Sequence, residues 1–174
     1  MRKISIITLS RYMTAKNKFI LKESVRLDDQ RKIYNKIDEE GHCPFCRENF
    51  LKYHKLPIIK EGKFWILTDN QWPYEKIKNQ LLAVYKTHIE HINEMDPLAA
   101  KELIEMFQEE SKKRNIPGGG IAIRFGSNRE HGGYGNSVLH LHAHLIEPDL
   151  DKLGPNEAWR FKFGQPKNYK SKPV

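Results

Sequence analysis

Residues 137–146 alternate between histidine and apolar side chains, and this stretch constrains the fold more than any other part of the sequence. Successive side chains of a β-strand point to opposite faces of a sheet, so a period of two predicts a strand. His140, His142 and His144 would then share one face, about 7 Å apart along it. The other face would be fully apolar and pack on a core, through Leu139, Leu141, Ala143 and Leu145. Because three imidazoles on one face each need a hydrogen-bond partner or solvent, the pattern indicates a functional site.

Two kinds of chemistry suit such a row of imidazoles. Histidines are common metal ligands, and an imidazole can also act as a nucleophile toward phosphorus. The loop at 126–137 directly precedes the row and contains several glycines, which let backbone N–H groups approach an anion closely. Asn128 and Ser137 would add side-chain donors to this loop. A phosphate-binding loop leading into a histidine-lined strand favours phosphorus chemistry over a bare metal site.

The rest of the chain shows helix and strand patterns around this stretch. A short helix is predicted at 27–40, with acidic residues in its first turn and Gly41 after its last. A longer helix opens at Asp96 and Pro97, which suit the N-cap and the first helical position. Apolar runs predict further strands at 63–68, 80–86 and 121–125. We therefore expect an α+β fold with a mainly antiparallel sheet of about five strands, one long helix and a short helix.

The net charge of +8 lies at the two ends of the chain. Residues 1–41 hold ten basic and six acidic residues, residues 151–174 hold six and two, and the stretch 42–150 is neutral. We therefore expect a basic N-terminal extension at 1–41, a catalytic domain at 42–150 and a basic C-terminal tail at 151–174. Basic ends can attract phosphate polyanions, but solubilising tails are the commoner explanation, so nucleic-acid binding is possible without being favoured.

The sequence lacks the features of membrane and export segments. Its apolar runs are only a few residues long, which predicts no membrane span. The first residues have neither the full apolar core nor the small-residue cleavage site of a signal peptide. Cys43 and Cys46, three positions apart, are accordingly expected to be thiols, and we predict a cytoplasmic protein.

The segment SVLHLHAHLIEP resembles the signature of the histidine triad (HIT) nucleotide-binding family, in which three histidines alternate with apolar residues. The resemblance extends back through ILTDN and QLLAVYKTHIEHINEM, and covers roughly residues 43–148. It implies a HIT-like fold, a homodimer, and a nucleotidyl hydrolase or transferase that acts on a purine nucleotide. A histidine of the triad would attack the α-phosphorus and form a nucleotidyl-histidine, which water or another acceptor then resolves.

The resemblance also implies roles for individual residues. His142 would be the nucleophile, with its second ring nitrogen bonded to a backbone carbonyl near His140. His144 would contact phosphate or leaving-group oxygens, and Ser137 would donate to the bridging or leaving oxygen. The implied nucleotide-binding residues are Phe45, Asp69, Asn70, Asn128, Gly135 and Asn136.

Three features depart from the family pattern. Asn136 stands where glutamine is frequent, Tyr85 stands where proline is usual, and the loop at 128–137 is one residue longer. The first and third of these features change the expected phosphate contacts. None of the three removes the nucleophile.

The cysteine pair and two histidines form a possible zinc site. A tetrahedral zinc needs four ligands, and a C-x-x-C turn supplies only two. By resemblance to zinc-containing members of the superfamily, we expect structural zinc at Cys43, Cys46, His88 and His140. His91 is the alternative to His88.

Three functions remain open at this point. The first is the nucleotidyl hydrolase or transferase, with dinucleoside polyphosphates, nucleoside phosphoramidates or nucleotidyl adducts as substrates. The second is a zinc-stabilised module that binds RNA or a nucleotide without catalysis. The third is a metallohydrolase in which His140, His142 and His144 hold a catalytic zinc.

Overall fold

The computed structural model describes residues 19–126 and 134–164. It has three α-helices, five strands and short 3-10 turns in this part of the chain. The helices are α1 Asp28–Glu40, α2 Arg47–Tyr53 and α3 Pro97–Lys113. The strands are β1 Ile58–Glu61, β2 Trp65–Asp69, β3 Ile77–Tyr85, β4 Gly120–Arg124 and β5 His142–Pro148. None of the described helices has the length and apolar content that crossing a membrane requires.

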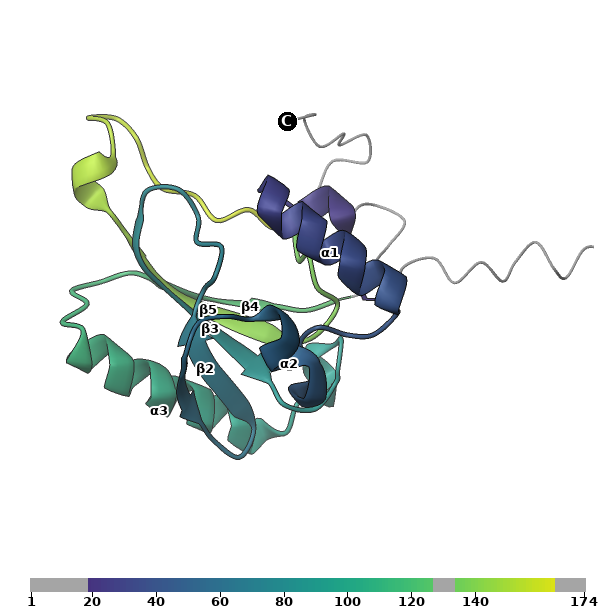
Figure 1. Cartoon of the computed structure of the whole chain (residues 1–174). Helices are drawn as coiled ribbons and strands as arrows, with labels where there is room; N and C mark the ends of the chain where they lie inside the picture. Colours follow the sequence, from purple (N-terminus) through teal and green to yellow (C-terminus); the bar gives the residue numbers. More distant parts are fainter. Residues whose placement is uncertain (1–18, 127–133, 165–174) are drawn as a thin grey trace, which may run out of the picture.

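The five strands form one antiparallel sheet in the order β1-β2-β3-β5-β4. Figure 1 shows α3 on one side of this sheet and α1 and α2 on the other. The expected α+β class and antiparallel sheet are confirmed. The short helix α2 and the edge strand β1 are additions, because the sequence had indicated only a turn around the two cysteines.

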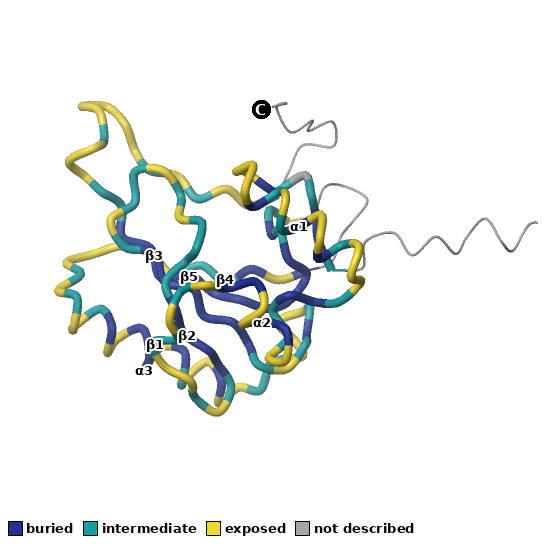
Figure 2. The backbone as a smooth tube through the Cα atoms, in the orientation of Figure 1, coloured by how far each residue is buried: buried dark blue, intermediate teal, exposed yellow. Residues whose placement is uncertain are grey.

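Helix α3 covers one face of the sheet. Asp96 caps the helix by accepting a hydrogen bond from the Leu98 N–H at 2.8 Å, and Pro97 occupies the first turn, as predicted. The helix buries Ala99, Leu103, Met106 and Phe107 against apolar side chains of β2, β3 and β5. This cluster is the main core, and Figure 2 shows the central strands as the most buried part of the chain.

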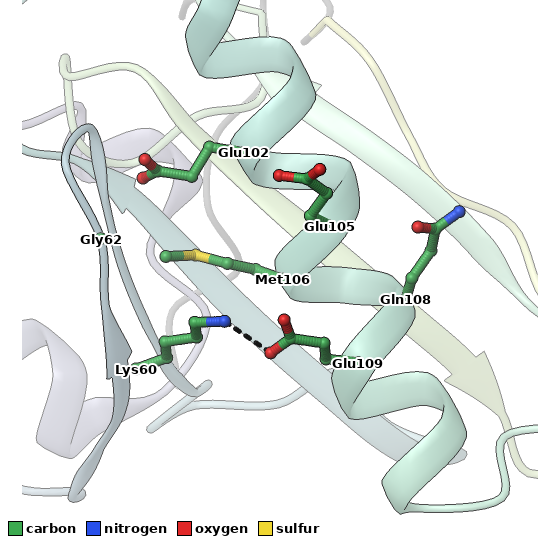
Figure 3. Close-up of a pocket in the computed structure, with 7 residues that line it drawn as sticks. All are labelled: Lys60, Gly62, Glu102, Glu105, Met106, Gln108 and Glu109. Atoms are coloured by element: carbon green, nitrogen blue, oxygen red, sulfur yellow. Dashed lines mark hydrogen bonds and ion pairs between the residues drawn. The ribbon is translucent and has the colours of Figure 1, made fainter.

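Helix α3 also binds the turn between β1 and β2. The Glu102 carboxylate accepts N–H groups of Lys63, Phe64 and Trp65 at 2.8–3.0 Å. Figure 3 shows Glu102 pointing toward this turn, beside a hollow of about 490 Å³ that Glu105 and Glu109 also line. The hollow lies on the α3 side, where Glu102 fixes the backbone.

The opposite face of the sheet is covered by α2 and by the segment that contains α1. Phe50 of α2 packs on Ile66, Leu82 and Val84. A neighbouring cluster joins Tyr34 and Ile37 of α1 to further side chains, which are Ile20, Val25, Cys43, Tyr53 and Val138. Residues on both sides of position 41 therefore share one apolar cluster.

The strand predicted at 137–146 is shorter than expected, and β5 begins only at His142. Before that point the backbone makes separate contacts in place of a ladder. Leu139 N–H donates to the Phe19 carbonyl and Leu141 N–H donates to the Ile89 carbonyl, each at 2.8 Å. These partners belong to segments that run past the sheet, so the prediction of a strand at 137–141 was wrong. His140 consequently lies outside the strand that carries His142 and His144.

Candidate functional site

His142 and His144 lie on the sheet face that α2 covers. In the strand register, His142 is opposite Val84 and Arg124, and His144 is opposite Leu82 and Ala122. Residues opposite each other on antiparallel strands point to the same face, and Val84 and Leu82 pack on Phe50 of α2. The two imidazole centroids are 5.3 Å apart, and both side chains are more than nine-tenths buried.

The ring of His142 has a fixed tautomer. Its Nδ1 lies 2.7 Å from the backbone carbonyl oxygen of His140, and a carbonyl only accepts, so Nδ1 carries the hydrogen. Nε2 then carries the lone pair, and it has no hydrogen-bond partner among the described residues. Burial lowers the pKa of His142 to about 3, against the raising effect of the His140 carbonyl. A buried neutral imidazole with one free nitrogen is suited to act as a nucleophile.

His144 is also neutral and lies beside His142. Burial lowers its pKa well below the usual value, and the neighbouring His142 and Arg124 lower it further. Its Nδ1 is 3.4 Å from the Gln80 side-chain nitrogen. The Tyr74 and Phe161 rings lie within 6.4 Å of the His144 ring, centroid to centroid.

Arg124 was missed by the sequence analysis. It ends β4, is opposite His142, and is 5% exposed. Its Nη1 donates to the Tyr134 carbonyl at 2.9 Å and its Nη2 donates to the Tyr74 hydroxyl at 3.4 Å. The only signal in the sequence was an arginine within the apolar run IAIRF. That signal becomes informative once the register places this arginine beside a histidine.

The loop before β5 carries part of the predicted phosphate-binding set and passes beside Arg124. Gly135 has φ +89°, and a side chain there would start 2.6 Å from Nη1 of Arg124. Asn136 is buried; its Nδ2 donates to the Gly126 carbonyl at 3.0 Å, while its Oδ1 has no partner among the described residues. The Ser137 hydroxyl lies 3.2 Å from the Tyr34 hydroxyl. Asn128 lies outside the described residues.

The three remaining nucleotide-binding candidates have different positions. Phe45 lies edge-on to His142, with ring centroids 5.3 Å apart. Asn70 accepts the Trp72 N–H at 3.2 Å and stabilises the turn after β2. Asp69 is opposite Leu81, on the α3 face, where Arg114 holds its carboxylate at 2.6 and 3.2 Å. The structure therefore brings Phe45 to the histidines and leaves Asp69 on the other side of the sheet.

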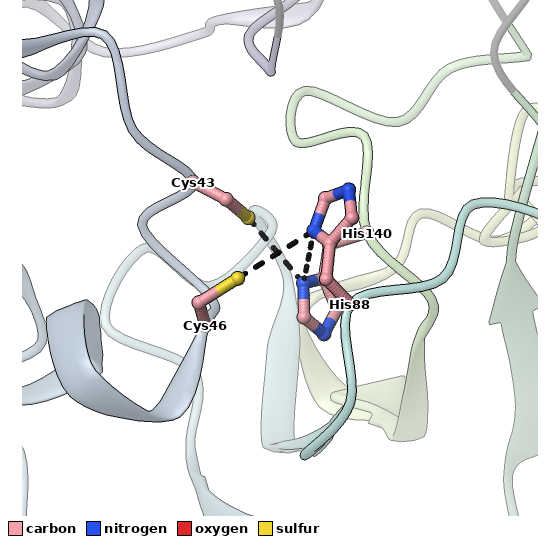
Figure 4. Close-up of side chains that lie close together, drawn as sticks. All are labelled: Cys43, Cys46, His88 and His140. Atoms are coloured by element: carbon pink, nitrogen blue, oxygen red, sulfur yellow. Dashed lines mark hydrogen bonds between the residues drawn. The ribbon is translucent and has the colours of Figure 1, made fainter.

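Cys43, Cys46, His88 and His140 converge from three segments of the chain, as Figure 4 shows. Their ligand atoms all lie within 4.8 Å of one another. The Cys43 sulfur is 3.3 Å from His140 Nδ1, the Cys46 sulfur is 3.6 Å from His88 Nδ1, and the two Nδ1 atoms are 3.2 Å apart. Tetrahedral zinc bonds of usual length imply ligand separations of roughly 3.3–3.8 Å, so the geometry fits zinc.

The hydrogen bonds around this cluster also fit a metal site. His140 Nε2 donates to the Tyr85 carbonyl at 2.5 Å, which leaves Nδ1 directed at the thiols. The neighbouring Cys43 thiol, together with His140 and His88, lowers the pKa of Cys46 to about 3. Among the described residues, no group of three potential ligands combines His140 with His142 and His144. The structure therefore gives no support to the three-histidine metallohydrolase.

Comparison with solved structures returns several histidine triad proteins. One from Clostridium difficile is 19% identical, with 67% of this chain and 96% of that chain covered and a TM-score of 0.49. A HIT family hydrolase from Clostridium thermocellum is 22% identical, with 66% and 96% covered and a TM-score of 0.47. A zinc-bound histidine triad family protein from Mycobacterium smegmatis is 17% identical, with 72% and 84% covered and a TM-score of 0.48.

Comparison at the sequence level gives no match. No family model matches the chain, and no curated protein matches it either.

Proposed function

We propose that this chain is a nucleotidyl hydrolase or transferase in which His142 attacks the α-phosphorus of a purine nucleotide conjugate. The observation that carries the proposal is the fixed orientation and neutral state of the His142 ring. Its Nδ1–H is held by the His140 carbonyl at 2.7 Å, and burial keeps the ring neutral. Nε2 is thereby fixed as the nucleophilic nitrogen before any substrate arrives, which removes an orientation cost from the reaction.

The reaction proceeds in two displacements. In the first, Nε2 of His142 forms a bond to the α-phosphorus while the bond from phosphorus to the leaving group breaks. In the second, water adds to the phosphorus and the bond to Nε2 breaks, which releases the nucleoside monophosphate and restores the neutral ring. In the intermediate the ring is positively charged. The His140 carbonyl stabilises this charge, because it accepts a hydrogen bond from the cationic Nδ1–H.

Ser137, supported by Tyr34, supplies a hydrogen bond to the departing group in this proposal. Burial raises the pKa of Tyr34, so its phenol stays protonated near neutral pH. Its hydroxyl can donate to the Ser137 oxygen 3.2 Å away, which leaves the Ser137 O–H directed elsewhere. That O–H would donate to the bridging oxygen or nitrogen, while His144 contacts the phosphate oxygens. Phe45 would border the nucleoside beside His142.

Zinc fits this proposal as a structural ion held by Cys43, Cys46, His88 and His140. When bound, it supplies a rigid link between the cysteine turn and His140. The carbonyl of the same His140 residue positions His142, so fixing His140 would also fix the nucleophile. Dimerisation and a cytoplasmic location stay predictions from the sequence.

The test is to trap the intermediate. The protein is incubated briefly with adenine and guanine nucleotide conjugates, quenched, and digested for mass spectrometry. We expect a nucleoside monophosphate adduct on the peptide that contains His142. His142→Asn should abolish turnover and the adduct while nucleotide binding persists, and His42→Asn, which changes a histidine beside Tyr53 and Glu40, should behave like wild type. Full turnover by His142→Asn would refute the proposal. Nucleotide binding without any turnover by wild type would favour the non-catalytic binding module.

A further inference from the structure

Two arginines that are far apart in the sequence meet at one tyrosine beside the histidines. Arg124 donates to the Tyr74 hydroxyl, and the guanidinium carbon of Arg26 lies 4.2 Å from the centroid of the Tyr74 ring. The Tyr74 ring is 6.4 Å from that of His144. We call Arg26 and Arg124 the arginine pair. Tyr74 therefore lies between Arg26 and His144, while Arg124 is itself opposite His142 in the sheet.

The arginine pair has only neutral hydrogen-bond partners in the described part of the chain. Arg26 donates to the Trp72 and Pro73 carbonyls at 2.6 and 3.4 Å, and Arg124 donates to Tyr134 and Tyr74. No described carboxylate forms an ion pair with either guanidinium, although Glu75 is near Arg26. A buried charge is normally paired, so Arg124 at 5% exposure is an exception that an anionic ligand would resolve.

The two guanidinium groups also disfavour each other. Arg26 is exposed as a residue, but its end lies against Tyr74, where desolvation lowers the pKa of Arg26; Tyr74, Tyr34 and Glu75 counteract this effect, and the charge of Arg124 adds a smaller lowering. Like charges held close together cost free energy unless an anion lies between or beside them. This unfavourable arrangement of charges lies next to His144, where the phosphates of a substrate attacked by His142 would have to bind.

An aromatic segment holds Arg124 in place. The Phe161 and Phe163 ring centroids lie 4.0 and 5.1 Å from the Arg124 guanidinium carbon. Trp159 stands beside Tyr74, at 5.8 Å between centroids, and its indole N–H donates to the Glu75 carbonyl at 3.2 Å. Three N–H groups of Arg124 have no acceptor among the described residues. The guanidinium is thus positioned in advance, with donors still available.

We infer that Arg26, Arg124 and Tyr74 bind the phosphates of the leaving group, so that the preferred substrates carry a polyphosphate on the α-phosphorus. This inference rests on the proposed function, because it assumes attack on that phosphorus from His142. An uncharged amine leaving group would gain nothing from the arginine pair, and a cationic one would be repelled. The site therefore selects dinucleoside polyphosphates over nucleoside phosphoramidates.

The test compares two substrates that share one adenosine monophosphate moiety, diadenosine tetraphosphate and adenosine 5′-phosphoramidate. Wild type should have the higher kcat/KM for the tetraphosphate. Arg26→Gln and Arg124→Gln should each lower the ratio of the two kcat/KM values by about tenfold or more, as expected for losing a charge-assisted hydrogen bond. Lys101→Gln removes an exposed positive charge from α3, on the other face of the sheet, and should leave the ratio unchanged.

A binding measurement separates this inference from the proposed function. Inorganic tripolyphosphate should bind wild type and His142→Asn in calorimetry, and should bind Arg26→Gln about tenfold more weakly. Arg26 is exposed, so its variant tests the site even if Arg124→Gln fails to fold. Equal losses on both substrates, a preference for the phosphoramidate, or no tripolyphosphate binding would each overturn the inference. Turnover by His142→Asn would overturn the proposed function, while tripolyphosphate binding would still report on the arginine pair.

Discussion

At the residue scale, Gly135 lies so close to Arg124 that the loop before β5 and the arginine opposite His142 constrain each other. The positive φ of Gly135 is a conformation that residues with a side chain rarely adopt. A Cβ there would start 2.6 Å from Nη1 of Arg124 and 3.2 Å from the Lys162 carbonyl. A glycine is therefore needed at this position, both to allow the positive φ and to leave room for the Arg124 guanidinium.

Gly135→Ala should lower stability by about 1–2 kcal/mol through the strained φ, and should lower kcat/KM through displacement of Arg124. Gly118→Ala is the matched control, because its Cβ meets nothing within 4 Å and its φ is not in the strained range. Urea denaturation and steady-state kinetics measure both effects. Equal behaviour of the two variants would show that Gly135 is an ordinary turn residue.

His54 gives the fold a measurable pH dependence. Its Nε2 lies 2.8 Å from the Thr68 hydroxyl, and burial lowers its pKa to about 4. An unfolded histidine has a pKa near 6.5, so between these values the unfolded chain binds more protons and stability falls with falling pH. The contribution is fully present above about pH 6.5 and is lost as pH falls toward about 4.

His54→Gln should reduce this acid sensitivity. The free energy of unfolding of wild type should drop between pH 7.5 and pH 4.5 by roughly 1–2 kcal/mol more than that of the variant, once solvent screening is allowed for. Urea midpoints at the two pH values give the comparison. Parallel losses in the two proteins would contradict the role assigned to His54.

The residues at the site differ in how far the sequence could place them. His142 and His144 could be assigned to one face because a period of two is a local property of the chain. Asp69 could not, because β2 is buried on both faces and its pattern does not reveal which one meets the histidines. Arg124 could not either, since its importance depends on being opposite His142, which is a matter of register.

At the scale of single elements, α3 was predicted best and β5 least well. Helix signals such as Asp96 and Pro97 act within a few residues, so they can be read locally. The segment before His142 has the pattern of a strand, but its N–H groups bond to Phe19 and Ile89, from distant parts of the chain. The alternation of side chains does not identify which segment of the chain forms backbone hydrogen bonds with this one.

Asp96→Ala should cost about 1 kcal/mol of stability, because the Leu98 N–H loses its acceptor at the start of α3. Glu105→Ala, an exposed change in the same helix, should cost less than half of that. Urea denaturation at neutral pH distinguishes the two. If both variants unfold at the same midpoint, the cap does not stabilise the helix.

At the scale of the whole molecule, the chain joins residues that are far apart in sequence. Tyr34 and Ile37 of α1 pack with Cys43 and Val138, so the described part of the segment 1–41 contributes to the core near the site. The four proposed zinc ligands likewise come from positions between 43 and 140. Removal of a metal at that point should therefore loosen several segments at once.

We expect one zinc per chain by elemental analysis. Chelation should lower the Tm by roughly 10 °C or more, since the metal stabilises only the folded state. Cys46→Ser should show the same drop and no further response to chelator, whereas His91→Gln, outside the cluster, should keep its zinc. A chain purified without metal, and with a Tm indifferent to chelator, would remove zinc from the proposal.

The aromatic segment that contacts Arg124 also makes the arginine pair depend on residues beyond the last strand. Arg26 and Phe161, which contact Tyr74 and Arg124, are 135 positions apart in the sequence. A chain shortened to the end of β5 would contain His142 and His144 but would lack the rings that pack on the Arg124 guanidinium. In such a shortened chain the two imidazoles would remain, and the guanidinium of Arg124 would lose the packing that orients it.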